Sequence, residues 1–453
     1  MIKYDTVVKG QLVMEDKVMY GKIGIIDGKI EKIADVDEHL SSKEEIDVGN
    51  NFVFPGAIDV HVHCFSNPKE GFLRASSSAA AGGVTTFLDM PYDLPNPVNN
   101  VDQFNKKVEL LEQEAIVDIG LWGTISKKHG TEQIIPLAKA GAMSFKMSTF
   151  ETDEYRFPKI PDSEILKAMN ILSDLDILVA FHSENDEIIK DLIKEYENNN
   201  KVYPRAHMET RPPVTETSSV LPLMEFAYWT NAKLHIVHVS HPRTIDLIQH
   251  FKDQGVKVSA ETCYSYLLLD VNDLEEYGPE AKINPPLRER EDVELLWERL
   301  KDEKIDLISS DHVPWQKEQK TVGNDNIFKA ASGTTGLQII VPLMFDSIVS
   351  KRGLSPVQFA KLMSQHPAET FSIRNKGKIT VGYDADFMVI DPNDTWKIDA
   401  SKFYSYSDSS PFHNREGKGK VVQTIVRGKT VYDGQNIVVN PGYGKFVKGS
   451  AAE

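Results

Sequence analysis

Two histidines separated by one residue are the first sign of chemistry in this 453-residue chain. His61 and His63 follow the apolar run 52–58, which predicts a buried strand. Side chains at positions i and i+2 of a strand point to the same face, and neutral imidazole is a common metal ligand. The pair therefore offers two nitrogens to one ion. Taken alone, it is equally consistent with ordinary surface or core histidines.

Other polar residues stand at the ends of further apolar runs, which alternate with amphipathic stretches. The runs cover 85–90, 116–121, 143–146, 178–182, 234–238, 256–261 and 307–311. Repeated strand–helix units predict a parallel sheet, and eight strand candidates favour a (β/α)8 TIM barrel over an open sheet. Catalytic groups of such barrels lie at the C-terminal ends of the strands. The candidates at those ends are His61, His63, Lys146, His182, His238 and Asp311.

Each candidate also has an ordinary alternative. His182 and His238 could be hydrogen-bonded core histidines, and Asp311 could be a helix N-cap. Lys146 lies in an apolar run, where burial lowers the pKa of an unpaired ammonium and exposes a neutral amine to carbon dioxide. The resulting carbamate would be an anionic ligand able to bridge two metals. A Schiff-base lysine and a salt-bridged structural lysine are the alternatives, and the surrounding histidines and aspartate favour metal bridging.

The two ends of the chain differ from its middle. They contain short strand-like runs and turn signals such as Asp27-Gly28 and Asp433-Gly434. We expect residues 1–52 and 377–453 to form one composite β domain. Residues 53–376 would then form the metal-binding (β/α)8 barrel domain. Two unrelated β appendages are the alternative.

Composition limits the cellular setting and the partners. The net charge of −16 argues against a nucleic-acid partner, which would favour a basic surface. Cys64 and Cys263 are the only cysteines, so no disulfide framework is implied and a reducing cytoplasm fits. The N-terminal residues lack the apolar core of a signal peptide, and no apolar run is long enough to cross a bilayer. We expect a cytoplasmic protein with no membrane partner.

Several short motifs together resemble the cyclic-amidase branch of the amidohydrolase superfamily, which holds allantoinases, dihydropyrimidinases or hydantoinases, and dihydroorotases. Besides the His-x-His strand, the motifs are 80–86, 144–146, 182–185, 211–213, 238–240, 261–263, 284–288 and 310–312. The resemblance implies a barrel, a β-sandwich formed by both termini and a binuclear zinc centre. It implies that one ion is held by His61, His63 and Asp311. The other ion would be held by His182 and His238, with carboxylated Lys146 and a hydroxide as bridges.

The resemblance also bears on the substrate. Dihydroorotases carry an arginine and an asparagine for the substrate carboxylate where this chain has Phe65 and Tyr92. A buried carboxylate without its cation is unfavourable, so dihydroorotase activity is disfavoured. The run 148–155 and the stretch from Gly333 to residue 338 are more similar to allantoinases. Tyr155 would match the intermediate-binding tyrosine of dihydropyrimidinases or be a surface residue. Asn284 would contact the substrate ring or cap a loop before a proline.

We therefore expect a metal-dependent hydrolase that opens a cyclic amide (ureide) ring by attack of a metal-bridging hydroxide. The expected activity is that of an allantoinase, from allantoin to allantoate, with Asp311 carrying the proton from the hydroxide to the leaving nitrogen. Dihydropyrimidinase or hydantoinase is the alternative, and a catalytically inactive assembly homologue is the non-enzyme alternative. The expected cofactors are two divalent ions, zinc by resemblance, and the expected assembly is a homodimer or homotetramer.

Overall fold

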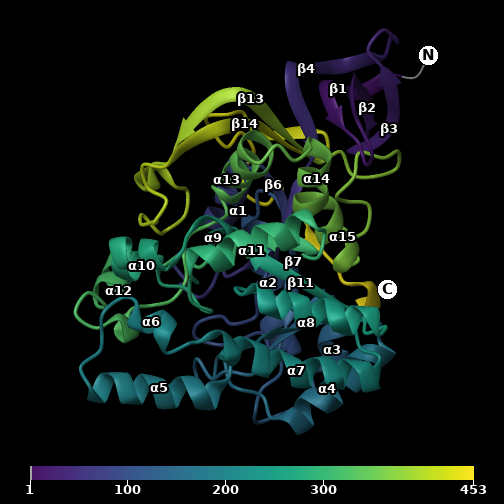
Figure 1. Ribbon diagram of the computed structural model, residues 1–453. Coiled ribbons are helices and arrows are strands. Elements are labelled where there is room, and N and C mark those ends of the chain that lie inside the picture. The colour runs from purple at the N-terminus through teal and green to yellow at the C-terminus, as the bar shows by residue number, and fades with distance from the viewer. Residues whose placement is uncertain (1–2, 453) are drawn as a thin grey trace.

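A barrel of eight parallel strands, surrounded by helices, forms the larger part of the computed structural model, which describes residues 3–452 (Figure 1). The strands follow one another around the barrel in sequence order. They are β5 (Ala57–Val62), β6 (Val84–Asp89), β7 (Asp118–Gly123), β8 (Ser144–Ser148), β9 (Val179–His182), β10 (Leu234–Ile236), β11 (Val258–Cys263) and β12 (Leu307–Ser309). The ring closes where the His63 amide donates to the His312 carbonyl at 2.9 Å, just beyond β12. The predicted (β/α)8 barrel is confirmed.

Helices alternate with these strands and cover the barrel. They are α1 (Gly71–Ala81), α2 (Val101–Glu114), α3 (Ile134–Ala140), α4 (Asp162–Asp174), α5 (Asp186–Asn198), α6 (Ala206–Glu209), α7 (Pro213–Thr230), α8 (Pro242–Asp253), α9 (Tyr264–Leu268), α10 (Val271–Tyr277), α11 (Arg290–Lys301), α12 (Lys317–Thr321), α13 (Ile340–Phe345), α14 (Pro356–Ala360) and α15 (His366–Thr370). Within residues 3–452, no helix combines the length and the apolar character needed to span a bilayer.

The hydrophobic pattern explains both kinds of element. Every residue of β5 to β9 is buried, as expected for parallel strands covered on both faces. In α4 the buried residues are Ile165, Ala168, Met169 and Leu172, a spacing that places them on one face of a helix. Barrel and helices therefore share a core, and the polar residues at the strand ends are left to face the mouth of the barrel.

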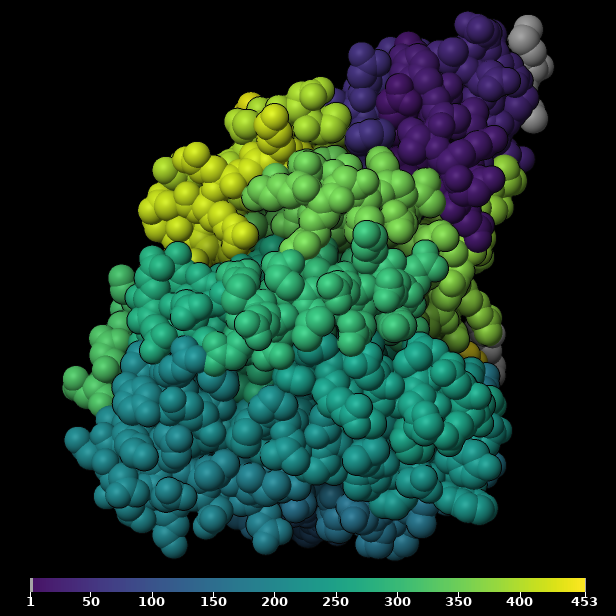
Figure 2. Space-filling view, in the orientation of Figure 1, coloured from purple at the N-terminus to yellow at the C-terminus, as the bar shows by residue number. Residues whose placement is uncertain are grey.

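A second sheet is built from both ends of the chain. Its seven strands run in the order β15-β14-β13-β4-β1-β2-β3, with β1 and β4 parallel and the other pairs antiparallel. The bounds are β1 (Lys3–Val13), β2 (Val18–Ile26), β3 (Lys29–Asp35), β4 (Ser41–Pro55), β13 (Phe387–Lys397), β14 (Glu416–Val426) and β15 (Lys429–Tyr432). Figure 2 shows the N-terminal strands as a lobe above the body of the molecule. The expected shared β domain is thereby confirmed, and its limits at residues 52 and 377 stay predictions.

One strand connects this sheet to the barrel. The last residues of β4, 52–55, pair antiparallel with residues 387–390 of β13, and β5 begins two residues later. Gly56 lies between β4 and β5, and only glycine fits there, because a Cβ would lie 2.1 Å from Oγ1 of Thr85. The strand that carries His61 is therefore continuous with the second sheet.

A buried ion-pair network also joins the two parts. Nζ of Lys376 lies 2.8 Å from Asp118, 3.0 Å from Asp384 and 2.5 Å from Asp386. Asp118 begins β7 of the barrel, and Asp386 precedes β13 of the second sheet. These three carboxylates could together hold a cation, but they already surround an ammonium. The cluster is therefore a structural link between the two sheets.

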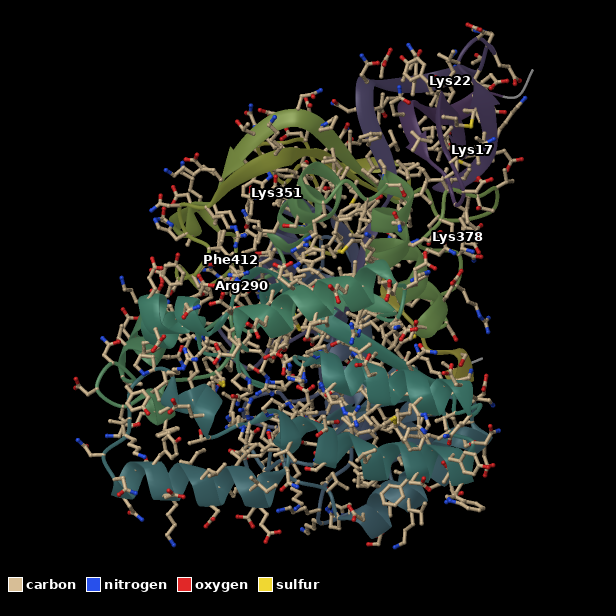
Figure 3. The ribbon with its side chains drawn as sticks, viewed as in Figure 1. Lys17, Lys22, Arg290, Lys351, Lys378 and Phe412 are labelled. Atoms are coloured by element: carbon tan, nitrogen blue, oxygen red, sulfur yellow. The ribbon has the colours of Figure 1, made fainter. Side chains whose placement is uncertain are left out.

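Two further contacts strengthen this junction. Lys378, labelled in Figure 3 below the N-terminal strands, pairs with Glu15 at 3.1 Å and with Glu369 of α15 at 2.8 Å. The short strand β16 (Phe446–Val447) returns to the barrel and pairs in parallel with β7. The C-terminal segment thus contacts the barrel as well as contributing to the second sheet.

Candidate active site

The six predicted metal ligands meet in one pocket at the C-terminal ends of the barrel strands. The pocket has a volume of about 560 Å³. Its lining includes His61, His63, Lys146, His182, His238 and Asp311. They come from β5, β8 and β9 or lie within two residues of the ends of β5, β10 and β12. The position of a catalytic site in a (β/α)8 barrel is therefore occupied by nitrogen and oxygen donors.

The donor atoms lie at distances that suit shared cations. Nδ1 of His182 is 2.9 Å from Nε2 of His238. Oδ1 of Asp311 is 3.2 Å from Nε2 of His61 and 3.5 Å from Nε2 of His63. Two ligand atoms of a tetrahedral zinc ion lie roughly 3.3 Å apart, because Zn–N bonds are about 2.0–2.1 Å long. The residues present fit a pair of metal ions with small side-chain shifts.

Protonation and backbone conformation agree with this use. Burial holds the pKa of His63 and His238 well below the usual histidine value, so both imidazoles are neutral as metal ligands must be. His238 and Asp311 have φ angles of 40° and 46°, in the left-handed region that non-glycine residues seldom adopt. Backbone strain of this kind concentrates at functional sites, where the surrounding structure maintains it.

Glu261 in the second half of β11 orients the predicted ligand His61. His61 donates from Nδ1 to Oε1 of Glu261 at 2.5 Å, which leaves the Nε2 lone pair directed toward Asp311. His235 donates to the other carboxylate oxygen at 3.2 Å. Burial opposes ionisation of this carboxyl, but His61 and His235 hold the pKa of Glu261 well below its usual range. The buried carboxylate therefore fixes the tautomer of one predicted ligand.

Glu184 does the same for His182. His182 donates from Nε2 to Glu184 at 2.8 Å, which leaves Nδ1 free to face His238. Arg211 donates to the other oxygen of Glu184 at 3.1 Å. Burial alone would raise the pKa of Glu184, but Arg211 and then His182 lower it to about 2. Each half of the predicted centre thus has its own buried carboxylate.

Lys146 in β8 is buried without a carboxylate partner. Among the described residues, none forms an ion pair with its ammonium, and Glu261 and Asp311 act on it only through space. Burial lowers its pKa to about 8, although these two carboxylates oppose the shift. The backbone is held firmly, because the Lys146 carbonyl accepts hydrogen bonds from Thr124 Oγ1 at 2.7 Å and Tyr92 OH at 3.2 Å.

Five residues stand at positions that the resemblance relates to the substrate, namely Phe65, Tyr92, Tyr155, Asn284 and Gly333, and three of them line the pocket. They are Tyr92, Asn284 and Gly333. Asn284 Oδ1 is buried and has no hydrogen-bond partner within residues 3–452, so an acceptor is available there. Gly333 has a φ of +125°, and a Cβ would lie 2.6 Å from Val313, so glycine is required at this point of the wall.

The structure does not bring Phe65 and Tyr155 into this pocket. The Phe65 ring packs edge-on against Phe72 with 4.9 Å between ring centroids, and the Lys107 ammonium lies 5.1 Å from its centroid. An apolar ring is more favourably placed in these contacts than at the polar mouth of the barrel. Tyr155 is 58% exposed, and its hydroxyl donates to Asn96 at 3.1 Å. Its place on the outer side of the loop follows from that contact.

Other pocket residues carry no signal in the sequence that marks them as functional. Arg156 and Phe157 enter the pocket from the loop after β8. Phe157 stacks on Tyr92 with ring centroids 3.7 Å apart, and this contact determines the path of the loop. Two carboxylates that orient predicted ligands were recognisable from the sequence. Glu184 lies two residues after the strand that ends in His182, and Glu261 lies in the next predicted strand after His238.

Comparisons with known proteins agree with this geometry. The sequence model described as "Amidohydrolase family" matches residues 52–431. The chain is 33% identical over 446 residues to an allantoinase of Desulfitobacterium hafniense, covering 97% of this chain and 98% of that protein. It is 31% identical over 450 residues to an L-hydantoinase of Paenarthrobacter aurescens, with 98% of both chains covered.

Solved structures of hydantoinases and dihydropyrimidinases have the same fold as this chain. The L-hydantoinase (dihydropyrimidinase) from Arthrobacter aurescens superposes with a TM-score of 0.95 at 31% identity, over 98% of this chain and 100% of that one. The dihydropyrimidinase from Brevibacillus agri gives a TM-score of 0.90 at 26% identity, over 98% and 99% of the two chains. From the match over most of its length and from these full-length relatives, the chain belongs to the amidohydrolase family.

Proposed function

We propose that this protein is a metal-dependent hydrolase that opens a cyclic ureide ring, with allantoin as its substrate and allantoate as its product. The observation that carries the proposal is the convergence of four imidazoles, a carboxylate and an unpaired buried lysine in one pocket. A structural role for so many polar groups would require them to satisfy one another. Instead, Nε2 of His61 is buried and has no hydrogen-bond partner in the described part of the chain.

Two divalent ions, zinc by resemblance to the family, would be shared among these donors. His61, His63 and Asp311 would hold one ion, and His182 and His238 the other. Lys146 would bridge them as its carbamate. The pKa of about 8 supports this role, because an appreciable fraction of the amine is neutral near pH 7–8 and can add carbon dioxide.

Ring opening would then combine what the metal ions supply with proton transfer and substrate orientation by side chains of this chain. Paired cations would supply a nucleophilic water of lowered pKa and would polarise the ring carbonyl. Asp311 would take the proton from that water and pass it to the leaving ring nitrogen, because its side chain is 18% exposed and lies at the pocket. The free Oδ1 of Asn284 would accept a ring N–H and orient the amide.

Allantoin is preferred because curated allantoinases are 33% identical to this chain along nearly its whole length. The similarity of 0.95 in TM-score to an L-hydantoinase keeps hydantoin or dihydropyrimidine opening as the second candidate. Dihydroorotate is disfavoured, since Phe65 and Tyr92 stand at the positions where dihydroorotases carry the arginine and asparagine for its carboxylate. An inactive assembly homologue is disfavoured because all six ligand positions are filled.

The test is direct. Zinc-loaded protein is incubated with allantoin, hydantoin, dihydrouracil and dihydroorotate, and ring opening is followed by absorbance and chromatography. Turnover of allantoin with the highest kcat/KM, lost in K146A, supports the proposal. Preference for dihydrouracil moves the assignment to dihydropyrimidinase. Absence of bound metal together with absence of turnover of all four compounds contradicts the proposal, and light scattering in the same buffer tests the expected dimer or tetramer.

A further inference from the structure

A guanidinium without an ionic partner lies in the wall of the pocket. Arg156 is partly buried, and its Nη1 donates to the Tyr92 carbonyl at 2.9 Å. Its Nε is buried and finds no hydrogen-bond partner among residues 3–452. Asp93 and Asp153 act on it only through space, and no described carboxylate forms an ion pair with its side chain. A positive charge and at least one directed donor therefore remain for a ligand.

Apart from Lys146, which is assigned above to the metal centre, each of the other cations of the pocket has a carboxylate or carbonyl partner, although Nε of Arg211 has no hydrogen-bond partner among residues 3–452. Lys190 pairs with Asp186 at 2.9 Å, and Arg211 pairs with Glu184 at 3.1 Å. The Lys282 ammonium donates to the carbonyls of residues 330 and 328 at 2.6 and 3.3 Å, which holds the loop before Gly333 in place. Arg156 differs from these three, because neither a carboxylate nor a pair of carbonyls takes up its donors.

The position of Arg156 is fixed by its loop. The backbone amides of Tyr155 and Arg156 donate to Oδ1 of Asp153 at 3.0 and 2.7 Å. The next residue, Phe157, stacks on Tyr92 and lies 5.7 Å from the His182 ring, measured between centroids. The guanidinium is thus presented beside the predicted metal ligands and is held there before a substrate arrives, which reduces the entropic cost of binding.

We propose that Arg156 is a specificity-determining substrate contact that selects cyclic ureides whose ring substituent carries an oxygen acceptor. The assignment rests on the proposed ring-opening function and narrows its substrate class. A ureido carbonyl and a carboxylate share the required acceptor chemistry, and a guanidinium can donate to either one. An apolar substituent would leave the cation unpaired in a wall that also contains Phe150 and Phe157, which is unfavourable.

The experiment compares three five-membered rings that differ only at one carbon. They are allantoin with a ureido group, hydantoin-5-acetic acid with a carboxylate, and unsubstituted hydantoin. In the zinc-loaded enzyme, R156M is expected to lower kcat/KM about 10- to 100-fold for the preferred substituted ring, the size of a lost hydrogen bond to a charged group. Turnover of hydantoin is expected to stay within about twofold. R156K, which keeps the charge but loses the planar fork, should fall between R156M and the wild type.

The arms separate the possible failures. R74M removes an exposed guanidinium from α1, outside the pocket, and should change none of the three ratios. The ureido and carboxylate compounds show which acceptor source is preferred. Equal losses for all three rings in R156M, or an unchanged ratio in an active R156M enzyme, would overturn the role of Arg156 and leave the proposed function intact. No turnover of any ring by the wild type would overturn both, and thermal melting confirms that each variant is folded.

Discussion

Replacement of Glu261 by glutamine is the sharpest test of how this site is organised. Oε1 of Glu261 accepts from His61 Nδ1 at 2.5 Å and from the His238 amide at 3.3 Å, while Oε2 accepts from His235. Glutamine keeps the shape but offers only one oxygen. That oxygen can serve His61 if His235 changes tautomer and donates from Nδ1 to Ser259, which lies 2.7 Å away. The variant thus removes the charge behind His61 with little loss of packing.

The size of the effect follows from this geometry. The buried carboxylate fixes the tautomer of His61 and the orientation of its ring, and loss of such a partner costs about 10- to 100-fold in metal affinity. This factor corresponds to about 1.4–2.7 kcal/mol. We expect E261Q to bind one zinc ion more weakly by this factor and to retain the second, because Glu184 supports His182 independently.

Zinc affinity is measured by competition with a chromophoric chelator, and bound metal is counted after dialysis. E216Q is the matched control, because Glu216 is equally buried but accepts from Ser240 and Thr244 and from no predicted ligand. Two tightly bound ions in E261Q, with the affinity of the wild type, would refute the role of Glu261. A loss of the same size in E216Q would show that the effect is unspecific.

Three further outcomes are expected. K376M should lower the free energy of unfolding by about 3–5 kcal/mol in urea denaturation, because two buried carboxylates and one partly buried carboxylate lose their ammonium, whereas the exposed pair removed in K420M should matter little; similar curves for both would contradict the network. In metal-free protein, the stability advantage of wild type over E184Q should be present above about pH 4.5 and shrink by about 3 kcal/mol as the pH falls toward 2, since the folded pKa of Glu184 is lowered to about 2; a gap independent of pH would refute the pairing with Arg211. Chelation should lower Tm and abolish turnover, and added zinc should restore both; an unaffected Tm would argue against the metal centre.

Much of this arrangement was accessible from the sequence because parallel barrels impose a simple rule. Apolar runs of the right length predict the strands, and a polar residue at the end of such a run must face the mouth. That rule brought together residues as distant as His61 and Asp311. The shared β domain was predictable from turn signals at both ends, whereas the return of β16 to the barrel was not, because a two-residue strand has no pattern of its own.

The substrate contacts were harder to predict for a physical reason. They lie on loops, where no helical or strand periodicity relates the position of a residue in the sequence to the direction of its side chain. Phe65 turned to Phe72, and Tyr155 turned to Asn96, while the neighbouring Arg156 entered the pocket. Adjacent residues of this loop therefore face opposite sides, Tyr155 outward and Arg156 into the pocket. The stacking of Phe157 on Tyr92 fixes this orientation of the loop.

The pairing of β4 with β13 has a consequence for biogenesis. Pro55 and its partner Phe387 are separated by about 330 residues, so the nascent chain emerges for roughly 15–65 s before the partner strand is synthesised. Throughout that interval the edge of β4 is unprotected, and β5, which follows it, lacks its anchor. A ribosome-bound intermediate would therefore hold His61 and His63 in a strand that is not yet secured, and binding of the proposed metal ions would follow the synthesis of β13.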